Sequence, residues 1–335
     1  MRALVLALIL CACRERMDRV ALRIDPAEAE AVLAAVGAPG DAGAFERVLE
    51  TVAYRRLRLR ELGMGRRFDD GDMRAFVAAP ELAARRVALA QAVAQWSRAD
   101  VRAIAGRVLP YLPAEARLVA TIYPVIKPKP NSFVNHDVLG SAIFVSVDPT
   151  RTAAQFENTI AHELHHIGFG SLNDSDAPCA AAPPVCRARV WTGAFAEGFA
   201  MLAAAGGPDV HPHRDSPPAD RERWDRDVAH VDDDVRTVEA FFREVLDSKL
   251  DDDAARARAM QFYGVQGPWY TVGWTMAVAI ERCFGRARLV DAMRAPWTVL
   301  ALYNDAHARC RSGTATATWD PEIVARLAAS PSSHM

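Results

Sequence analysis

The sequence predicts an α+β protein that is predominantly α-helical and contains a small β-sheet. Helical periodicity extends over residues 25–109, two short segments rich in β-branched residues follow, and helical patterns return after residue 152. The chain has 335 residues, of which 51% are hydrophobic and 24% are charged. These fractions exclude a disordered chain and a coiled coil, so we expect a globular protein.

The overall charge is close to neutral. The chain carries 40 basic and 42 acidic residues, which gives a formal net charge of -2, and it has no concentrated basic run. This balance argues against nucleic acid as a partner. All but three of the basic residues are arginine, a bias that we interpret as genomic base composition.

Residues 1–13 are typical of an export signal. One arginine precedes an apolar run over residues 3–10, which is far shorter than the roughly 20 residues that span a bilayer. The segment Leu10–Cys13 resembles a bacterial lipobox, although Cys11 departs from the small or β-branched residue usual at its position. The resemblance implies a lipid on Cys13, a membrane anchor and an exported, cell-envelope location. The alternative is an ordinary cleaved signal or an incorrectly assigned start.

We expect residues 14–112 to form a helical N-terminal region. Asp25 is a favourable N-cap, Pro26 suits the first helical position, and Glu28 is placed for a capping box. Two further helical stretches are predicted at residues 42–62 and 80–106. None of these three helical segments carries residues that suggest chemistry.

Two strands and another helix come next. Residues 117–126 and 141–147 are short and β-branched, which is typical of strands. Thr152 and Gln155 form a capping-box pattern at the start of a helix that runs to residue 166. Later helices are predicted at residues 191–205, 221–248 and 269–284, with loops at 171–184 and 206–220.

The segment His162–His166 reads His-Glu-Leu-His-His and matches the pattern H-E-x-x-H. Positions four apart lie on one face of a helix, so His162 and His166 can hold one zinc ion. Glu163 is rotated away from the metal yet stays near it, which suits a general base acting on a zinc-bound water. His165 competes as a ligand at a three-residue spacing, but only His166 gives Glu163 its usual relation to both ligands.

A catalytic zinc needs a third protein ligand and an open position for water. The metzincin extension is excluded, because Phe169 and Leu172 stand where it requires glycine and histidine. Glu197 is the better candidate, since it is the one carboxylate in the apolar run 191–200, where a metal would offset the cost of burying its charge. The alternatives are a salt-bridge role for Glu197, or loop ligands from Asp174, Asp176, His211 and His213.

Two more segments carry a resemblance to a known family. Ala196–Ala200 resembles the Asn-Glu-Gly-Phe-Ala stretch of gluzincin aminopeptidases, whose Glu is the third zinc ligand, although the gap from His166 is longer than theirs. Tyr270 is the first residue of a Tyr-x-x-Gly-Trp segment at the start of a predicted helix. Together with H-E-x-x-H, these segments make residues 115–295 resemble bacterial families of zinc-dependent peptidases of the gluzincin type.

The resemblance implies a zincin-like catalytic domain over residues 113–335, a Zn²⁺ cofactor, and a peptide or protein substrate. It also implies that Tyr270 lies near the metal, where its phenol can hydrogen-bond the oxyanion of a tetrahedral intermediate. The alternatives are a packing role for Tyr270, and the phenols of Tyr263 and Tyr303 in its place.

Four cysteines follow the predicted signal. Cys179 and Cys186 flank a short loop between the two candidate ligand helices, and an oxidising envelope would favour a disulfide there. Cys283 and Cys310 are either a second disulfide or two buried thiols.

The sequence therefore predicts a zinc-dependent hydrolase of the peptidase class, with His162, His166 and Glu197 as ligands. Glu163 would deprotonate the zinc-bound water for attack on a peptide carbonyl. The alternative is an envelope lipoprotein that acts as a binding module, with a structural or vestigial metal site. A free coordination position separates the two hypotheses, because only the enzyme needs one.

Overall fold

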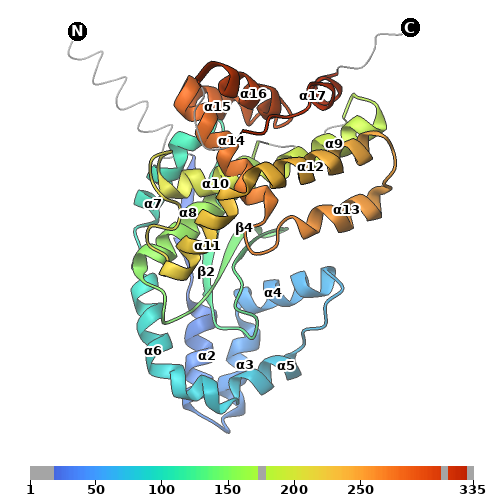
Figure 1. Cartoon of the computed structure of the whole chain (residues 1–335). Helices are drawn as coiled ribbons and strands as arrows, with labels where there is room; N and C mark the ends of the chain where they lie inside the picture. Colours follow the sequence, from blue (N-terminus) through green and yellow to red (C-terminus); the bar gives the residue numbers. More distant parts are fainter. Residues whose placement is uncertain (1–18, 173–178, 311–315, 330–335) are drawn as a thin grey trace, which may run out of the picture. The chain divides into compact units, whose positions relative to one another are not determined.

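The computed structural model describes residues 19–172, 179–310 and 316–329. The predicted signal, with Cys11 and Cys13, lies outside these residues. The chain folds into two units (Figure 1): one contains the residues up to 105 together with 117–167, and the other contains 106–116 together with the residues from 168 onward. The predicted domain boundary between residues 112 and 113 stays a prediction.

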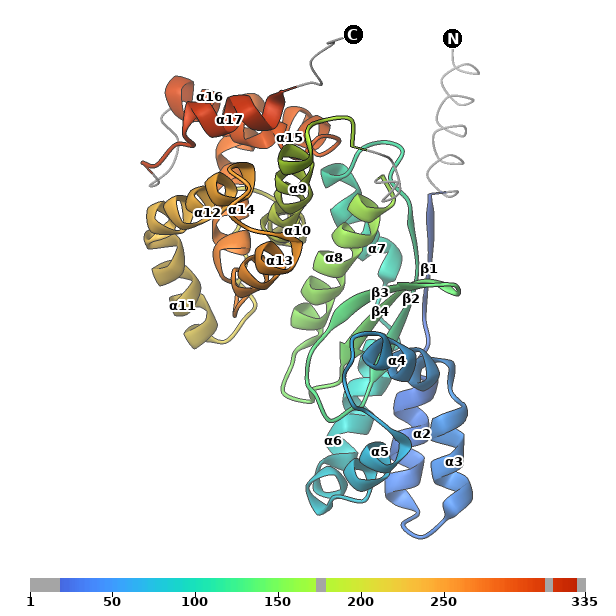
Figure 2. The ribbon, with the colours of Figure 1, turned by 90° about the vertical axis from the view of Figure 1, so that its right-hand side faces the viewer.

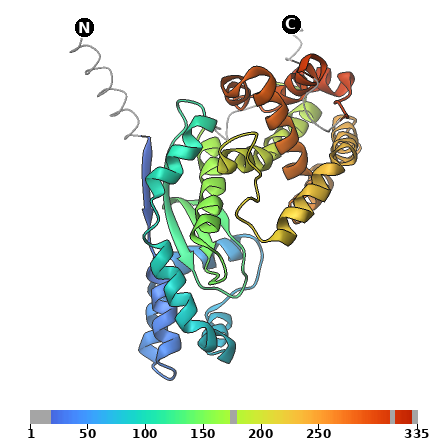
Figure 3. The same ribbon diagram turned by 60° about the vertical axis from the view of Figure 1, so that its left-hand side comes forward.

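The first unit contains a mixed sheet of four strands in the order β1-β2-β4-β3. The strands are β1 (Val20–Ile24), β2 (Leu118–Val125), β3 (Phe133–Asp137) and β4 (Gly140–Ser146). β1, β2 and β4 are parallel, and β3 pairs antiparallel with β4. β1 forms one edge of the sheet (Figure 3). The strands predicted at residues 117–126 and 141–147 are confirmed as β2 and β4, whereas β1 and β3 were not predicted.

Helices surround this sheet. They are α2 (Ala27–Gly37), α3 (Ala42–Glu50), α4 (Val52–Gly63), α5 (Asp70–Val77) and α6 (Pro80–Trp96), with α7 (Val101–Val108) and α8 (Ala153–Gly170) running on into the second unit. α8 runs alongside the sheet (Figure 2). The predicted stretch 42–62 is in fact two helices, because Thr51 ends α3 and caps α4 by accepting the Tyr54 N–H. The predicted stretch 80–106 is likewise divided after Trp96.

Two predicted capping boxes have different outcomes. At the start of α8 the box is confirmed: the Thr152 N–H donates to Gln155 Oε1 at 2.8 Å, and the Gln155 N–H donates to Thr152 Oγ1 at 3.2 Å. At α2 the prediction for Glu28 is wrong. Its fully buried carboxyl accepts the N–H of Ile126 at 2.9 Å and so ties α2 to the end of β2. Burial raises the pKa of Glu28 from 4.5 to about 8.

The second unit is helical in the described residues. Its elements are η1 (Leu109–Tyr111), α9 (Pro183–Thr192), η2 (Gly193–Phe195), α10 (Ala196–Ala205), α11 (Pro218–Ala229), α12 (Val231–Leu246), α13 (Asp252–Gln261), α14 (Pro268–Phe284), α15 (Arg286–Ala292), α16 (Thr298–Cys310) and α17 (Pro321–Ala328). α14 is its central element, since it packs against α10, α12, α15 and α16. The predominantly helical structure with a small sheet confirms the predicted fold class. No helix of the described residues is both long and apolar enough to cross a membrane.

The crossing of α10 and α14 depends on two glycines. A Cβ at Gly198 would lie 2.0 Å from the backbone nitrogen of Trp274, and a Cβ at Gly273 would lie 2.6 Å from the carbonyl oxygen of Phe195. Both contacts are with backbone atoms, which cannot rotate away as a flexible side chain can. The two helices can therefore approach this closely only where each has a glycine.

The glycine contact predicts a large loss of stability on substitution. We expect Gly198→Ala to lower the free energy of unfolding by at least about 2 kcal/mol, because overpacking against fixed backbone costs this much or more. Urea denaturation measures the change. The matched control is Gly193→Ala, at a helical glycine with no atom in the way of a Cβ, and it should change stability by no more than about 1 kcal/mol. Equal stability of the two variants would contradict the assignment.

The buried Glu28 predicts a pH dependence of stability in the first unit. Because the pKa of Glu28 is raised, the folded chain keeps on this carboxyl a proton that the unfolded chain releases above pH 4.5. The stability that the protonated Glu28 contributes to the folded state is therefore complete below pH 4.5 and is lost as pH rises through about 8. Between pH 5 and pH 8, the unfolding free energy of the unmodified protein should fall by a few kcal/mol relative to Glu28→Gln. Denaturation at several pH values tests this, with the exposed Glu30→Gln as the control. Parallel pH profiles for Glu28→Gln and the unmodified protein would refute it.

Candidate metal centre

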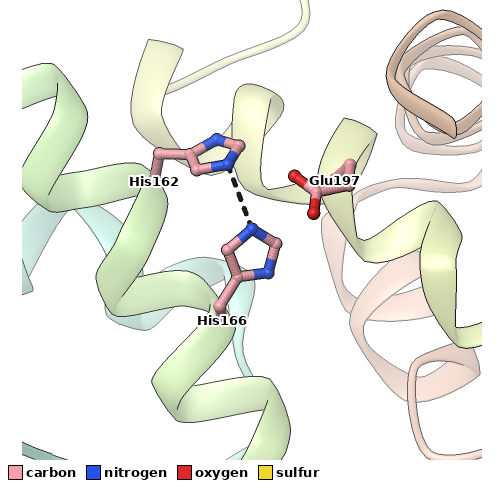
Figure 4. A group of neighbouring side chains, drawn as sticks. All are labelled: His162, His166 and Glu197. Carbon is pink, nitrogen blue, oxygen red and sulfur yellow. Dashed lines mark hydrogen bonds between the residues drawn. The ribbon is translucent and has the colours of Figure 1, made fainter. Parts of the chain in front are cut away.

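The two histidines of the H-E-x-x-H segment lie one turn apart on α8 and approach each other with their ring nitrogens. The Nε2 atoms of His162 and His166 are 3.0 Å apart (Figure 4). The opposite side of the same helix is held in the core, because Ile160 and Leu164 are fully buried. The buried face thus orients the histidine pair without using it for packing.

Glu197 completes the group from the first turn of α10. Each of the three residues His162, His166 and Glu197 offers one ligand atom, and these three atoms lie within 4.8 Å of one another (Figure 4). All three side chains are half-buried, whereas the residues on either side of Glu197 are buried. The described residues hold no second group of three metal-binding side chains of this kind.

The donor set has the chemistry that zinc requires. Two imidazole nitrogens and a carboxylate oxygen are the protein ligands of one common class of catalytic zinc sites. Two nitrogens bound to a tetrahedral zinc at about 2.0–2.1 Å are about 3.3 Å apart, which is close to the separation of the histidine Nε2 atoms. With three protein donors, a fourth position is left for water or substrate. The residues present therefore fit a zinc ion.

The alternative ligands lie outside this group. His165 is fully buried and is not a member of it. His211 instead contacts Asp225, with Nε2 and Oδ1 2.9 Å apart, and His213 Nδ1 lies 3.1 Å from the hydroxyl of Ser216. The two loop aspartates that were considered, Asp174 and Asp176, fall outside the described residues.

The predicted general base follows His162 directly in α8. Each helical residue advances by about 100°, so Glu163 lies beside the face that carries His162 and His166 and not on it. Its side chain is half-buried. A catalytic role for Glu163 stays a prediction.

The three candidate tyrosines differ in their surroundings. Tyr270 is half-buried in the first turn of α14, three residues before Gly273. Burial is the main reason that the pKa of Tyr263 rises to about 12, and the negative charge of Glu197 acts in the same direction. The buried hydroxyl of Tyr303 donates to the carbonyl oxygen of Ala317 at 3.1 Å, so this phenol serves packing.

Sequence reasoning did not identify the influence of Glu197 on Tyr263. The relation depends on how the segment before α14 folds back toward α10, and no spacing in the sequence encodes it. The glycines of the α10–α14 crossing were present in the two family-like segments, as the residue after Glu197 and as the glycine of Tyr-x-x-Gly-Trp. Their meaning as a contact became visible only in the structure.

Both predicted cysteine pairs are disulfides. The Cα atoms of Cys179 and Cys186 are 5.8 Å apart, and those of Cys283 and Cys310 are 5.7 Å apart, which are ordinary separations for a disulfide. The first bond closes the segment that leads into α9. The second joins α14 to α16, so it strengthens the packing around the central helix of the second unit.

Comparison with known proteins agrees with this site. Residues 53–310 match the model of a family described as "Putative zinc dependent peptidase (DUF5700)". No curated protein and no solved structure gave a match. The matched range covers more than half of the chain and includes both histidines, Glu197 and the glycine crossing. The chain therefore belongs to this family, DUF5700.

Proposed function

We propose that this protein is a zinc-dependent peptidase whose metal is held by His162, His166 and Glu197. The observation that carries the proposal is the convergence of two imidazoles and one carboxylate within 4.8 Å from helices α8 and α10. Membership of the family also supports the proposal, because the description of that family names a zinc-dependent peptidase.

The proposed mechanism assigns proton transfer to Glu163. When bound, the zinc ion lowers the pKa of a coordinated water and polarises the substrate carbonyl. The Glu163 carboxylate accepts a proton from the attacking water as the new C–O bond forms. It then delivers that proton to the amide nitrogen as the C–N bond breaks, which restores the carboxylate and releases the amine.

A phenol is proposed to stabilise the oxyanion of the tetrahedral intermediate. Tyr270 is the first choice, because it lies on α14 three residues before the glycine that contacts α10. Its O–H would donate a hydrogen bond to the oxygen that gains charge as water attacks. Tyr263 is the second choice, because its phenol is close enough to Glu197 for that charge to affect its pKa.

We also propose that the protein works outside the cytoplasm. The two disulfides support this location, because such bonds persist in oxidising compartments. The lipid on Cys13 and the resulting membrane anchor belong to the same proposal, and the lipobox-like segment supports them. The substrate class is peptide or protein.

Substitution of Glu163 tests the mechanism and the metal site separately. We expect Glu163→Gln to keep one zinc per chain and to lower the turnover of a peptide library by about 10²–10⁴-fold, because it loses the proton acceptor. His162→Ala should lose both zinc and activity. Elemental analysis of purified protein and mass spectrometry of the library give the two measurements. Unchanged turnover in Glu163→Gln would refute the assignment of the base.

The tyrosine assignment has its own test. Tyr270→Phe should lower kcat by about 10²-fold with little change in KM, because a hydrogen bond formed only in the transition state is removed. Tyr263→Phe is the matched comparison, since it removes the other nearby hydroxyl while keeping the ring. If the loss of kcat follows Tyr263→Phe and not Tyr270→Phe, the role of Tyr270 is wrong.

A further inference from the structure

A cavity lies in the first unit at the end of β2. It has a volume of about 210 Å³ and is formed by the end of α4, the segment before α5 and the loop that follows β2. None of its lining residues belongs to the candidate metal centre. Four basic side chains line it, from Arg66, Arg67, Lys127 and Lys129, against the single carboxylate of Glu61.

The one carboxylate of the cavity is already shared between arginines. Glu61 Oε1 lies 2.5 Å from a guanidinium nitrogen of Arg60, and Glu61 Oε2 lies 3.5 Å from one of Arg66. Arg67 is strongly exposed and has Asp69 as its partner at 3.6 Å. No carboxylate of the described residues forms an ion pair with either lysine of this cavity. Four cationic side chains against one carboxylate therefore leave the lining of the cavity with an excess of positive charge.

Lys127 is the most constrained of these cations. It is only 7% exposed, and its ammonium donates to Asn131 Oδ1 at 2.7 Å and to the backbone carbonyl of Lys129. These are neutral acceptors, and an ammonium has three N–H donors. Burial is the main reason that the pKa of Lys127 falls to about 8; the charges of Arg60 and Lys129 act in the same direction, and those of Glu61 and Glu28 oppose it. A buried cation of this kind gains from a bound anion that replaces its lost hydration.

The use of lysine here is itself unusual for this chain. The sequence has only three lysines among 40 basic residues, and two of them lie in this loop. Genomic base composition explains why arginine is preferred over lysine in this chain, but it does not explain why two positions of one cavity are lysine. A compact ammonium can occupy a small buried space beside a ligand that the larger planar guanidinium would fill.

The remaining wall of the cavity is apolar. Leu57, Phe68 and Pro128 line it, and Leu57 and Phe68 belong to the packed core between α4 and the sheet. The volume is below the range of about 300–1,000 Å³ that is usual for drug-sized ligands. The space therefore suits a small molecule that combines one anionic group with one short apolar group.

We propose that this cavity binds a small carboxylate bearing one aliphatic side chain, the chemistry of the C-terminal apolar residue of a peptide. Its carboxylate accepts hydrogen bonds from Lys127 and the Arg66 guanidinium, and its side chain contacts Leu57 and Phe68. This binding does not depend on the proposed peptidase activity, because it needs neither zinc nor turnover.

Calorimetric titration of metal-free protein tests the proposal, with N-acetyl-leucine as the probe. We expect binding in about the millimolar range, and at least tenfold weaker binding of N-acetyl-leucinamide, which keeps the side chain but lacks the charge. Acetate, which keeps the charge but lacks the side chain, should also bind at least tenfold more weakly. Equal affinity of N-acetyl-leucine and its amide would overturn the proposal, as would tighter binding of inorganic phosphate.

Matched variants locate the binding. Lys127→Met should weaken N-acetyl-leucine binding at least tenfold, whereas Lys249→Met should leave it unchanged, since Lys249 lies outside the cavity and pairs with Asp247 at 3.2 Å. If Lys127→Met does not fold, the exposed Arg66→Gln carries the same expectation. His162→Ala should bind the probe normally, which separates this cavity from the candidate metal centre. Equal binding by the Lys127 and Lys249 variants, or loss of binding in His162→Ala, would overturn the assignment.

Discussion

Direct contact between the backbones of α10 and α14 is the constraint on which the second unit depends. The helices meet where Gly198 faces Gly273, and neither position has room for even a methyl group. Glu197 immediately precedes this contact, so the backbone that carries the proposed third metal ligand is fixed by packing that no side-chain rotation can relax. α14 is held in turn by the disulfide to α16 and by the rings of Phe195 and Trp269, whose centroids are 5.3 Å apart. The position of the carboxylate is therefore set by the core of its own unit.

The histidine pair is fixed by a different device. α8 begins at a reciprocal capping box between Thr152 and Gln155, and Ile160 and Leu164 bury one side of it. The cap fixes where the helix begins, and the buried residues fix which side of it faces the core. Together they determine that His162 and His166 lie on the opposite side. A half-buried carboxylate and two half-buried imidazoles are costly to desolvate, and a bound cation reverses that cost. Zinc binding and the local fold should therefore reinforce each other, as they do when a site is formed by the folded chain.

Local signals in the sequence predicted much of this structure, and long-range ones were missed. The H-E-x-x-H helix, its capping box and the two central strands depend on neighbouring residues, and all were predicted. β1 was missed because it is short and acquires its partner only when Val20 pairs with Leu118, far along the chain. Glu28 was interpreted as a capping residue because its spacing fits one, but a hydrogen bond from Ile126 uses its carboxyl instead. The cavity beside Lys127 was not predicted either, because its walls come from α4 and from a loop that lies far from α4 in sequence.

The central claim is that one zinc ion is held by two imidazoles and one carboxylate, without sulfur ligands. X-ray absorption spectroscopy at the zinc edge, on protein loaded with one equivalent of zinc, tests this most directly. We expect nitrogen and oxygen neighbours at about 2.0–2.2 Å from the zinc, with the multiple-scattering signature of two imidazoles. Loss of one oxygen neighbour in Glu197→Ala would assign the third ligand. A sulfur neighbour at about 2.3 Å, or a spectrum unchanged by substitution of either histidine, would contradict the account.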